Sequence, residues 1–170
     1  MLNWSKYENF QRSEFDSPDY TNSGDLMQSS TLNLLQKART LSKTPFVITS
    51  GFRTKAHNTK VNGVSDSAHL TGKAVDIAVT PLNYVLILSS LIKAGFRRIG
   101  LYAKHIHADN DHKKKTPACW TYTEKLKTLK DKIYKILNDK QSTSWLSVFA
   151  PAIILLLLYT LKKKKKNVQL

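Results

Sequence analysis

The chain has 170 residues and one cysteine, Cys119, so it can form one domain of ordinary size but neither a disulfide framework nor a cysteine-based zinc cluster. Its formal charge of +15 is unevenly spread. Residues 1–121 carry 16 Lys and Arg against 9 Asp and Glu, whereas residues 122–170 carry 11 against 3. Because the C-terminal lysines surround an apolar stretch, we expect a membrane partner and no nucleic acid.

The first 29 residues are polar, with five aromatic side chains spaced among Ser, Asp and Asn. We expect residues 1–29 to form a wrapping arm with little regular structure, whose aromatic side chains pack onto the domain. Contact of these aromatic side chains with substrate is the less favoured alternative. No apolar run follows Met1, so we expect no secretory signal peptide. The aromatic residues of the arm are Trp4, Tyr7, Phe10, Phe15 and Tyr20.

A domain spanning residues 30–121 is expected to follow the arm. Ser30 or Thr31 can cap a helix that runs to about Leu41, because both hydroxyls can accept a hydrogen bond from the first turn. Three apolar residues of this segment share one helical face. Residues 46–49 have the β-branched and aromatic composition of a core strand. The apolar helical face consists of Leu32, Leu35 and Ala38.

Arg53 lies just after the end of that strand. A guanidinium can hold a carboxylate or a carbonyl group of a bound peptide through paired hydrogen bonds. The alternative is an exposed arginine in an ion pair with a neighbouring residue. The next part of the chain carries a metal-ligand pattern, and the family resemblance described below implies the substrate contact. The loop between the two, residues 54–66, should contain a short helical turn.

Two imidazoles and one carboxylate form that pattern, namely His69, Asp76 and His107. Gly72 permits a tight turn, after which residues 74–79 read as a buried strand. Asp76 would lie inside that strand, where a carboxylate is costly unless it is paired or binds a metal. Three nitrogen or oxygen ligands with a fourth position open to water are typical of catalytic zinc. The pattern therefore predicts one zinc ion held by these three residues.

The rest of the domain alternates helix and strand. Pro81 suits the first turn of a helix over residues 82–94, and Gly95 ends that helix. Residues 97–102 and 105–109 read as two further strands. The predicted fold class is α+β, a small antiparallel sheet with flanking helices. The residues of the helix that we expect to be buried are Leu86, Ile87, Leu91 and Ile92.

The last strand has an unusual composition. His105, His107 and Asp109 occupy alternate positions, so their side chains project from one face of the strand. A strand that places two imidazoles and a carboxylate on one side is hard to explain by packing alone. We therefore assign His105 and Asp109, together with His107, to the same site.

These residues resemble the M15 peptidases, the zinc peptidases of peptidoglycan that include D-Ala-D-Ala carboxypeptidases and phage L-Ala-D-Glu endolysins. The family signature is Ser-x-His-x-x-Gly-x-Ala-x-Asp followed later by His-x-Asp, and the chain is similar to the compact bacteriophage versions from about Phe10 to Tyr122. The resemblance implies the fold shared by Hedgehog domains and DD-peptidases, one Zn²⁺, a peptidoglycan peptide as substrate, and substrate contacts by Arg53 and Ser67. The matching residues are Ser67, His69, Gly72, Ala74, Asp76, His107 and Asp109, with further similarity at 48–54, Asn58, 98–102 and Trp120.

The catalytic base is left open by the resemblance. Many members carry Glu or Asp three residues before the last histidine ligand, but this chain has Lys104 there, which cannot act as a base while protonated. Asp109 is the first candidate for the base, although it can instead orient His107. His105 is the alternative, either as the base or as a donor to the tetrahedral oxyanion.

Residues 122–140 change in character, because apolar residues recur there at helical spacing among six lysines. This pattern predicts a basic amphipathic helix or linker that lies on an anionic membrane surface. Packing of the helix back onto the domain is nearly as well supported, and a short coiled coil is a weaker third option.

Residues 141–161 contain no charged residue, and as a helix they would be roughly 31 Å long, enough to span a bilayer core. Trp145 and Tyr159 lie near the two ends, where aromatic side chains favour the membrane interface. The Lys-rich tail, residues 162–170, should remain on the cytoplasmic side. We therefore predict a single-pass membrane protein, in the host cell envelope or in a membrane-containing virion.

Three functional classes fit these features. The leading one is a zinc peptidase that hydrolyses peptide bonds of bacterial peptidoglycan, as a membrane-tethered phage endolysin in host lysis or as a virion wall hydrolase. The second is a catalytically silent module that binds zinc or cell wall, because Lys104 replaces the usual acid. The third is a holin-like, membrane-active lysis protein whose domain is a passenger.

Overall fold

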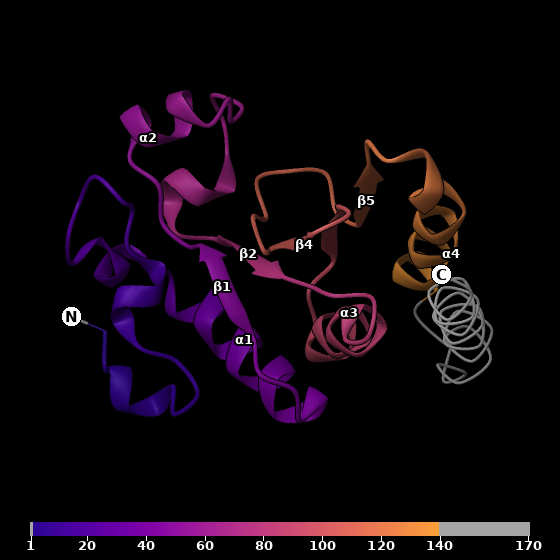
Figure 1. Cartoon of the computed structure of the whole chain (residues 1–170), viewed down its shortest axis with the longest axis horizontal. Coiled ribbons are helices and arrows are strands. Elements are labelled where there is room, and N and C mark those ends of the chain that lie inside the picture. The colour runs from indigo at the N-terminus through magenta and orange to yellow at the C-terminus, as the bar shows by residue number, and fades with distance from the viewer. Residues whose placement is uncertain (1, 140–170) are drawn as a thin grey trace, which may run out of the picture.

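The computed structural model describes residues 2–139, and within this range it forms a five-stranded sheet covered by helices (Figure 1). The helices are α1 (Ser29–Ser42), α2 (Lys55–Lys60), α3 (Tyr84–Ala94) and α4 (Lys127–Asn138). The strands are β1 (Val47–Ser50), β2 (Ala74–Ala78), β3 (Arg98–Leu101), β4 (His105–Asp109) and β5 (Ala118–Thr121). Short 3-10 helices occur at Trp4–Lys6, Arg12–Phe15, Ser23–Leu26, Ala68–Thr71 and Glu124–Leu126.

The strand order is β1-β2-β4-β3-β5. The first four strands pair antiparallel, but β5 pairs parallel with β3, so the sheet is mixed rather than antiparallel as the sequence predicted. No strand was expected at Ala118–Thr121, because four residues without an apolar run give no local signal. The loop after β4 returns the chain to the far edge of β3, which makes β5 run in the direction of β3. The α+β class itself is confirmed.

One face of the sheet forms the core. Alternate strand residues on this face are completely buried, and α1 and α3 pack against each other beneath it (Figure 1). Because side chains alternate along a strand, the residues between these core positions point to the opposite face. The core face therefore leaves the other face free for polar chemistry. The strand residues of the core face include Val75, Ile77, Ile99, Leu101, Ile106 and Ala108.

The two long helices differ from prediction at their N-termini. The residue before the first turn of α1 is Gln28, so neither Ser30 nor Thr31 is the cap, although the predicted apolar face of α1 is buried. Pro81 lies in a turn, and α3 begins three residues later at Tyr84. Leu86 was predicted to be buried but is 47% exposed, because it shares the solvent-facing stripe of α3 with Lys93 at i+7.

The N-terminal arm wraps the domain through its aromatic side chains. Tyr7, Phe10 and Phe15 are buried, and the Trp4 ring lies 5.4 Å from the Phe15 ring. Tyr20 is 54% exposed and does not share this packing. The arm also contains three short 3-10 helices, whereas little regular structure was expected.

Helix α4 packs against β5 and joins the core. Ile133, Ile136 and Leu137 are buried, and the Arg97 guanidinium donates a hydrogen bond to the Leu137 carbonyl. The apolar side of this basic helix therefore contacts the domain, which is the second of the three options drawn from the sequence. No helix within residues 2–139 is long and apolar enough to cross a membrane, and the predicted anchor at 141–161 lies outside the described residues.

Candidate metal centre and its cleft

A single row of residues crosses the polar face of the sheet. In the strand register, Ser50 pairs with Asp76, Asp76 with His107, His107 with Gly100, and Gly100 with Trp120. Residues directly opposite one another in a sheet share a face. The two metal-ligand candidates on strands are therefore neighbours because β2 pairs with β4 in this register, although 31 residues separate them in the chain.

His69 reaches the same place from a short 3-10 helix that precedes β2. Ser67 caps this helix, with its hydroxyl accepting a hydrogen bond from the His69 N–H at 3.4 Å. Gly72 ends the helix with a φ of 66°, and a side chain there would collide with the Leu26 carbonyl. The expected tight turn at Gly72 is therefore present, and it brings the His69 ring, which is 2% exposed, over β2.

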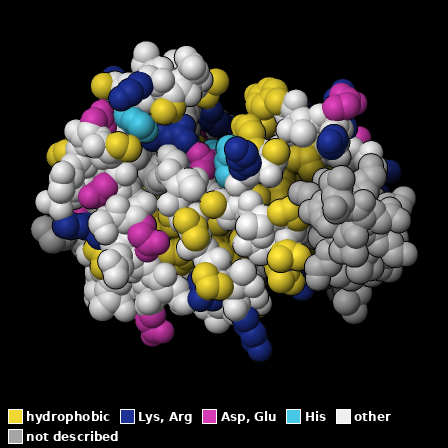
Figure 2. All heavy atoms as spheres, in the orientation of Figure 1, with side chains coloured by type: hydrophobic (Ala, Val, Ile, Leu, Met, Phe, Trp, Pro, Cys, Tyr) yellow, Lys and Arg dark blue, Asp and Glu magenta, His cyan; other side chains and the backbone are white. Residues whose placement is uncertain are grey.

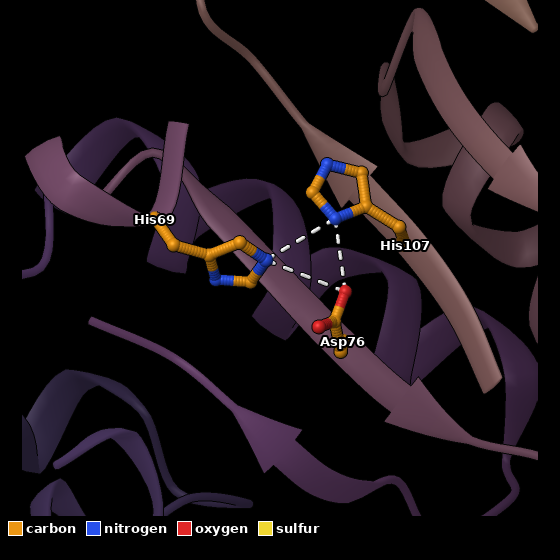
Figure 3. Close-up of side chains that lie close together, drawn as sticks. All are labelled: His69, Asp76 and His107. Atoms are coloured by element: carbon orange, nitrogen blue, oxygen red, sulfur yellow. Dashed lines mark hydrogen bonds and ion pairs between the residues drawn. The ribbon is translucent and has the colours of Figure 1, made fainter. Parts of the chain in front are cut away.

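The three candidate ligand atoms converge on one point (Figure 3). His107 Nδ1 lies 2.9 Å from Asp76 Oδ1 and 3.2 Å from His69 Nε2, and His69 Nε2 lies 3.4 Å from Asp76 Oδ1. All three atoms lie within 4.8 Å of one another. Two imidazole nitrogens and one carboxylate oxygen in this arrangement match the donor set of a three-ligand catalytic zinc site.

The atoms of His69 and Asp76 that point away from the cluster, His69 Nδ1 and Asp76 Oδ2, also form hydrogen bonds. His69 Nδ1 lies 2.7 Å from the Gly51 carbonyl, so Nδ1 carries the proton and Nε2 keeps its lone pair toward the cluster. Asp76 Oδ2 accepts a hydrogen bond of 2.5 Å from Arg53. Such outer contacts fix the orientation of metal ligands. The residues therefore fit a zinc ion without rearrangement of these two side chains.

His107 is oriented in the same way by Asp109. His107 Nε2 lies 3.2 Å from Asp109 Oδ2, while Asp109 Oδ1 accepts hydrogen bonds from Arg98 Nε at 2.8 Å and from the Asp111 N–H at 3.0 Å. The Asp109 side chain is 2% exposed. Asp109 thus lies behind His107, away from the converging atoms, and this geometry favours the orienting role over the role of base.

The cluster also perturbs the pKa of each ligand. Burial lowers the pKa of His69 below its ordinary value, which keeps this ring neutral. Burial alone would raise the pKa of Asp76, but the nearby His69 and His107 rings outweigh it and hold the pKa well below the ordinary value. Burial alone would lower the pKa of His107, but its hydrogen bonds to Asp109 and Asp76 raise that pKa to about 9. A divalent cation would therefore compete with a proton at His107.

The cluster forms the floor of an open cleft with a volume of about 610 Å³. Figure 2 shows histidine, acidic and basic side chains gathered in one hollow on this face, with hydrophobic side chains on its β5 side. The cleft is lined by Arg53, Val61, Asn62, Gly63, Val64, Ser67, Ala68, His69, Asp76, Arg98, Tyr102, His105, His107, Asp109, Lys114, Trp120 and Tyr122.

The other predicted site residues also line the cleft. Arg53 and Ser67 lie at its wall, but both hold the metal cluster: Arg53 is paired with Asp76, and Ser67 caps the helix of His69. Their substrate contacts remain predictions. His105 lies on the cleft face, half-buried, and burial lowers its pKa below the ordinary value. Lys104, exposed, is not among the lining residues.

Two functional residues were not assigned a role from the sequence. Arg98 holds Asp109 and stacks over Trp120, with the guanidinium carbon 5.6 Å from the ring centroid. Trp120 lies 5.4 Å from the His107 ring, centroid to centroid. Arg98 has a detectable signal, since it lies two residues before Gly100 on a strand and so shares its face. Trp120 is among the residues that resemble the family, but its place in the cleft depends on the parallel pairing of β5, which the sequence did not predict.

Comparison with known proteins agrees with this geometry. Residues 8–109 match the family described as Peptidase M15, and this match covers more than half of the 170 residues and contains all three candidate metal ligands. A comparison with curated proteins found no match. The matched segment, the ligand set and the cleft lead to one assignment: the chain belongs to the Peptidase M15 family of metallopeptidases.

Proposed function

We propose that this protein hydrolyses peptide bonds of bacterial peptidoglycan with one zinc ion held by His69, Asp76 and His107. The observation that carries the proposal is the convergence of these three ligand atoms at the floor of an open cleft. When bound, zinc supplies a Lewis acid that activates water and polarises the scissile carbonyl. The M15 peptidases that the sequence resembles act on wall peptides, which supports this substrate class.

The ligands are held ready for the metal by the chain's own contacts. The Gly51 carbonyl and Asp109 fix the tautomers of the two imidazoles, and Arg53 holds the second carboxylate oxygen of Asp76. Arg53 can also contact substrate through Nη1, because its bonds to Ser50 and Asp76 use Nε and Nη2. This second contact would orient a substrate carbonyl or carboxylate next to the metal.

His105 is the group we propose for proton transfer. It lines the cleft on the same face as His107, and its lowered pKa leaves the ring neutral at pH 7 and able to accept a proton. It would take the proton of the attacking water and return it to the leaving amine nitrogen. Asp109, the first candidate from the sequence, is turned away behind His107 and is proposed to position that ring.

The direct test uses the full chain purified with one equivalent of zinc and incubated with peptidoglycan. Mass spectrometry of the released fragments identifies the bond that is cut. We expect His69→Ala to abolish cleavage and His112→Ala to preserve it, because His112 is exposed and lies outside the cleft lining. Stoichiometric zinc binding without cleavage would refute the enzyme and support the silent zinc- or wall-binding module that Lys104 suggests.

We further propose that residues 141–161 tether the protein to a membrane, as in a phage endolysin acting in host lysis or a virion wall hydrolase. The support is compositional: this stretch has no charged residue and is followed by five lysines. Alkaline extraction of membranes from expressing cells tests it. The full chain should remain with the membrane, and a chain that lacks residues 141–170 should be released; release of both would contradict the tether.

A further inference from the structure

Four aromatic side chains stand together on the β5 side of the cleft. They are Tyr102, His105, Trp120 and Tyr122, and we call them the aromatic wall. The Tyr102 and His105 rings stack at 4.2 Å between centroids with an interplanar angle of 15°. Tyr122 lies 6.1 Å from Tyr102, and Trp120 Nε1 donates a hydrogen bond of 3.4 Å to the Tyr102 hydroxyl.

Core packing does not explain the aromatic wall. Tyr122 is 83% exposed, and Tyr102, His105 and Trp120 are only partly buried. The backbone beneath the wall is adapted to it, because a Cβ on Gly100 would lie 2.9 Å from the indole of Trp120. Exposed aromatic side chains gathered beside a metal centre indicate a binding surface.

The wall faces an apolar rim on the other side of the cleft. Val61 is 44% exposed and Val64 is 64% exposed, and both line the cleft. The groove between rim and wall has polar edges, because the tyrosine hydroxyls and the histidine ring can form hydrogen bonds at its margin. It therefore suits a flat group with an apolar face and polar edges.

We infer that the aromatic wall binds a sugar ring of the glycan to which the substrate peptide is attached. This inference rests on the proposed function. Stem peptides of peptidoglycan consist of alanine, glutamate and a diamino acid, and none of these has a large apolar side chain that would fill the groove. A pyranose ring has a C–H face that stacks on aromatic rings and hydroxyl edges that form hydrogen bonds.

The position of the aromatic wall also indicates which peptide bond of the stem is hydrolysed. Trp120 lies beside the ligand His107, so a sugar on the wall would be within a residue or two of the scissile bond. The bond between the first and second stem residues, L-Ala and D-Glu, lies next to the sugar. The terminal D-Ala-D-Ala bond is three residues further, about 10 Å in an extended chain. The wall therefore favours the L-Ala-D-Glu bond.

The test compares two substrates that contain both bonds: a free pentapeptide stem and the same stem linked to its N-acetylmuramic acid disaccharide. With the zinc-loaded full chain, we expect cleavage at L-Ala-D-Glu and a kcat/KM about tenfold higher for the glycan-linked substrate, the size of one good stacking contact. Tyr122→Ala should lower kcat/KM for the glycan-linked substrate about tenfold, to the value that the same variant shows for the free stem. Tyr134→Ala, an exposed tyrosine on α4 outside the cleft lining, should keep the preference.

Three outcomes would overturn the inference. These are equal kcat/KM for both substrates, cleavage at the terminal bond whether or not the sugar is present, or a decrease in kcat/KM for Tyr122→Ala that is the same for both substrates. If the zinc-loaded protein cuts neither substrate, the proposed function fails, and binding of the two substrates then decides the inference. Tighter binding of the glycan-linked stem that is lost in Tyr122→Ala would support the wall, and equal binding would refute it.

Discussion

Asp109 offers the sharpest test of how the metal centre is built. Substitution Asp109→Asn keeps the size of the side chain but removes its negative charge. The carboxylate of Asp109 accepts hydrogen bonds from His107 Nε2 at 3.2 Å and from Arg98 Nε at 2.8 Å. The side chain is 2% exposed, so water cannot replace the lost partner. Loss of a partner behind a metal ligand lowers metal affinity about 10- to 100-fold, which corresponds to about 1.4–2.8 kcal/mol.

The assay is competition for zinc between the protein and a chromophoric chelator. Asp66→Asn is the matched control. Asp66 also forms an ion pair with a basic side chain, Lys114, but the Asp66 side chain is 74% exposed. We expect the zinc dissociation constant to rise for Asp109→Asn and to stay within twofold for Asp66→Asn. A dissociation constant for Asp109→Asn equal to that of the unsubstituted protein would refute the positioning role of Asp109.

The described contacts lead to three further predictions. The pKa of His107 is raised to about 9 in the zinc-free protein, so zinc must displace a proton from this ring. The zinc affinity should therefore rise about tenfold per pH unit from pH 6.5 to 8.5. Competition titrations in which the affinity does not change with pH would contradict this prediction. For the same reason, the stability that protonated His107 gives the zinc-free fold should be fully present below pH 6.5 and lost as pH rises through 9, as measured by urea unfolding. Ile133→Ala should lower the free energy of unfolding by about 2–5 kcal/mol because Ile133 is fully buried, whereas the exposed Lys132→Ala should change it little.

The sequence indicated the three candidate metal ligands because part of their signal is local. The turn at Gly72 and the alternation along β2 and β4 determine which side chains share a face, but the convergence of His69, Asp76 and His107 also depends on the pairing of β2 with β4. From the sequence, Asp109 could be either the catalytic base or the residue that orients His107. Its distance to His107 and its hydrogen bond from Arg98 favour the orienting role, and these two contacts depend on the register between strands.

Non-local pairing accounts for what the sequence did not predict. The segment Ala118–Thr121 is too short for a periodic pattern, and it becomes a strand because an open edge of β3 is available to it. The amphipathic pattern of α4 fits a membrane surface and a protein surface equally well, since both accept one apolar face. The contact of α4 with β5, a strand that the sequence did not predict, accounts for the burial of Ile133 against the domain.

The division of the cleft between two parts of the chain has a consequence for how this enzyme can diversify. The ligands and their supports come from within residues 8–109, the segment that matches the family, whereas Trp120 and Tyr122 come from β5 and the turn after it. Helix α4 packs against β5, so the segment after β4 forms its own contacts beside the metal ligands. Recombination at the loop after β4 could therefore replace Trp120 and Tyr122, two of the four members of the aromatic wall, in a single event, while Tyr102 and His105 stay with the metal ligands.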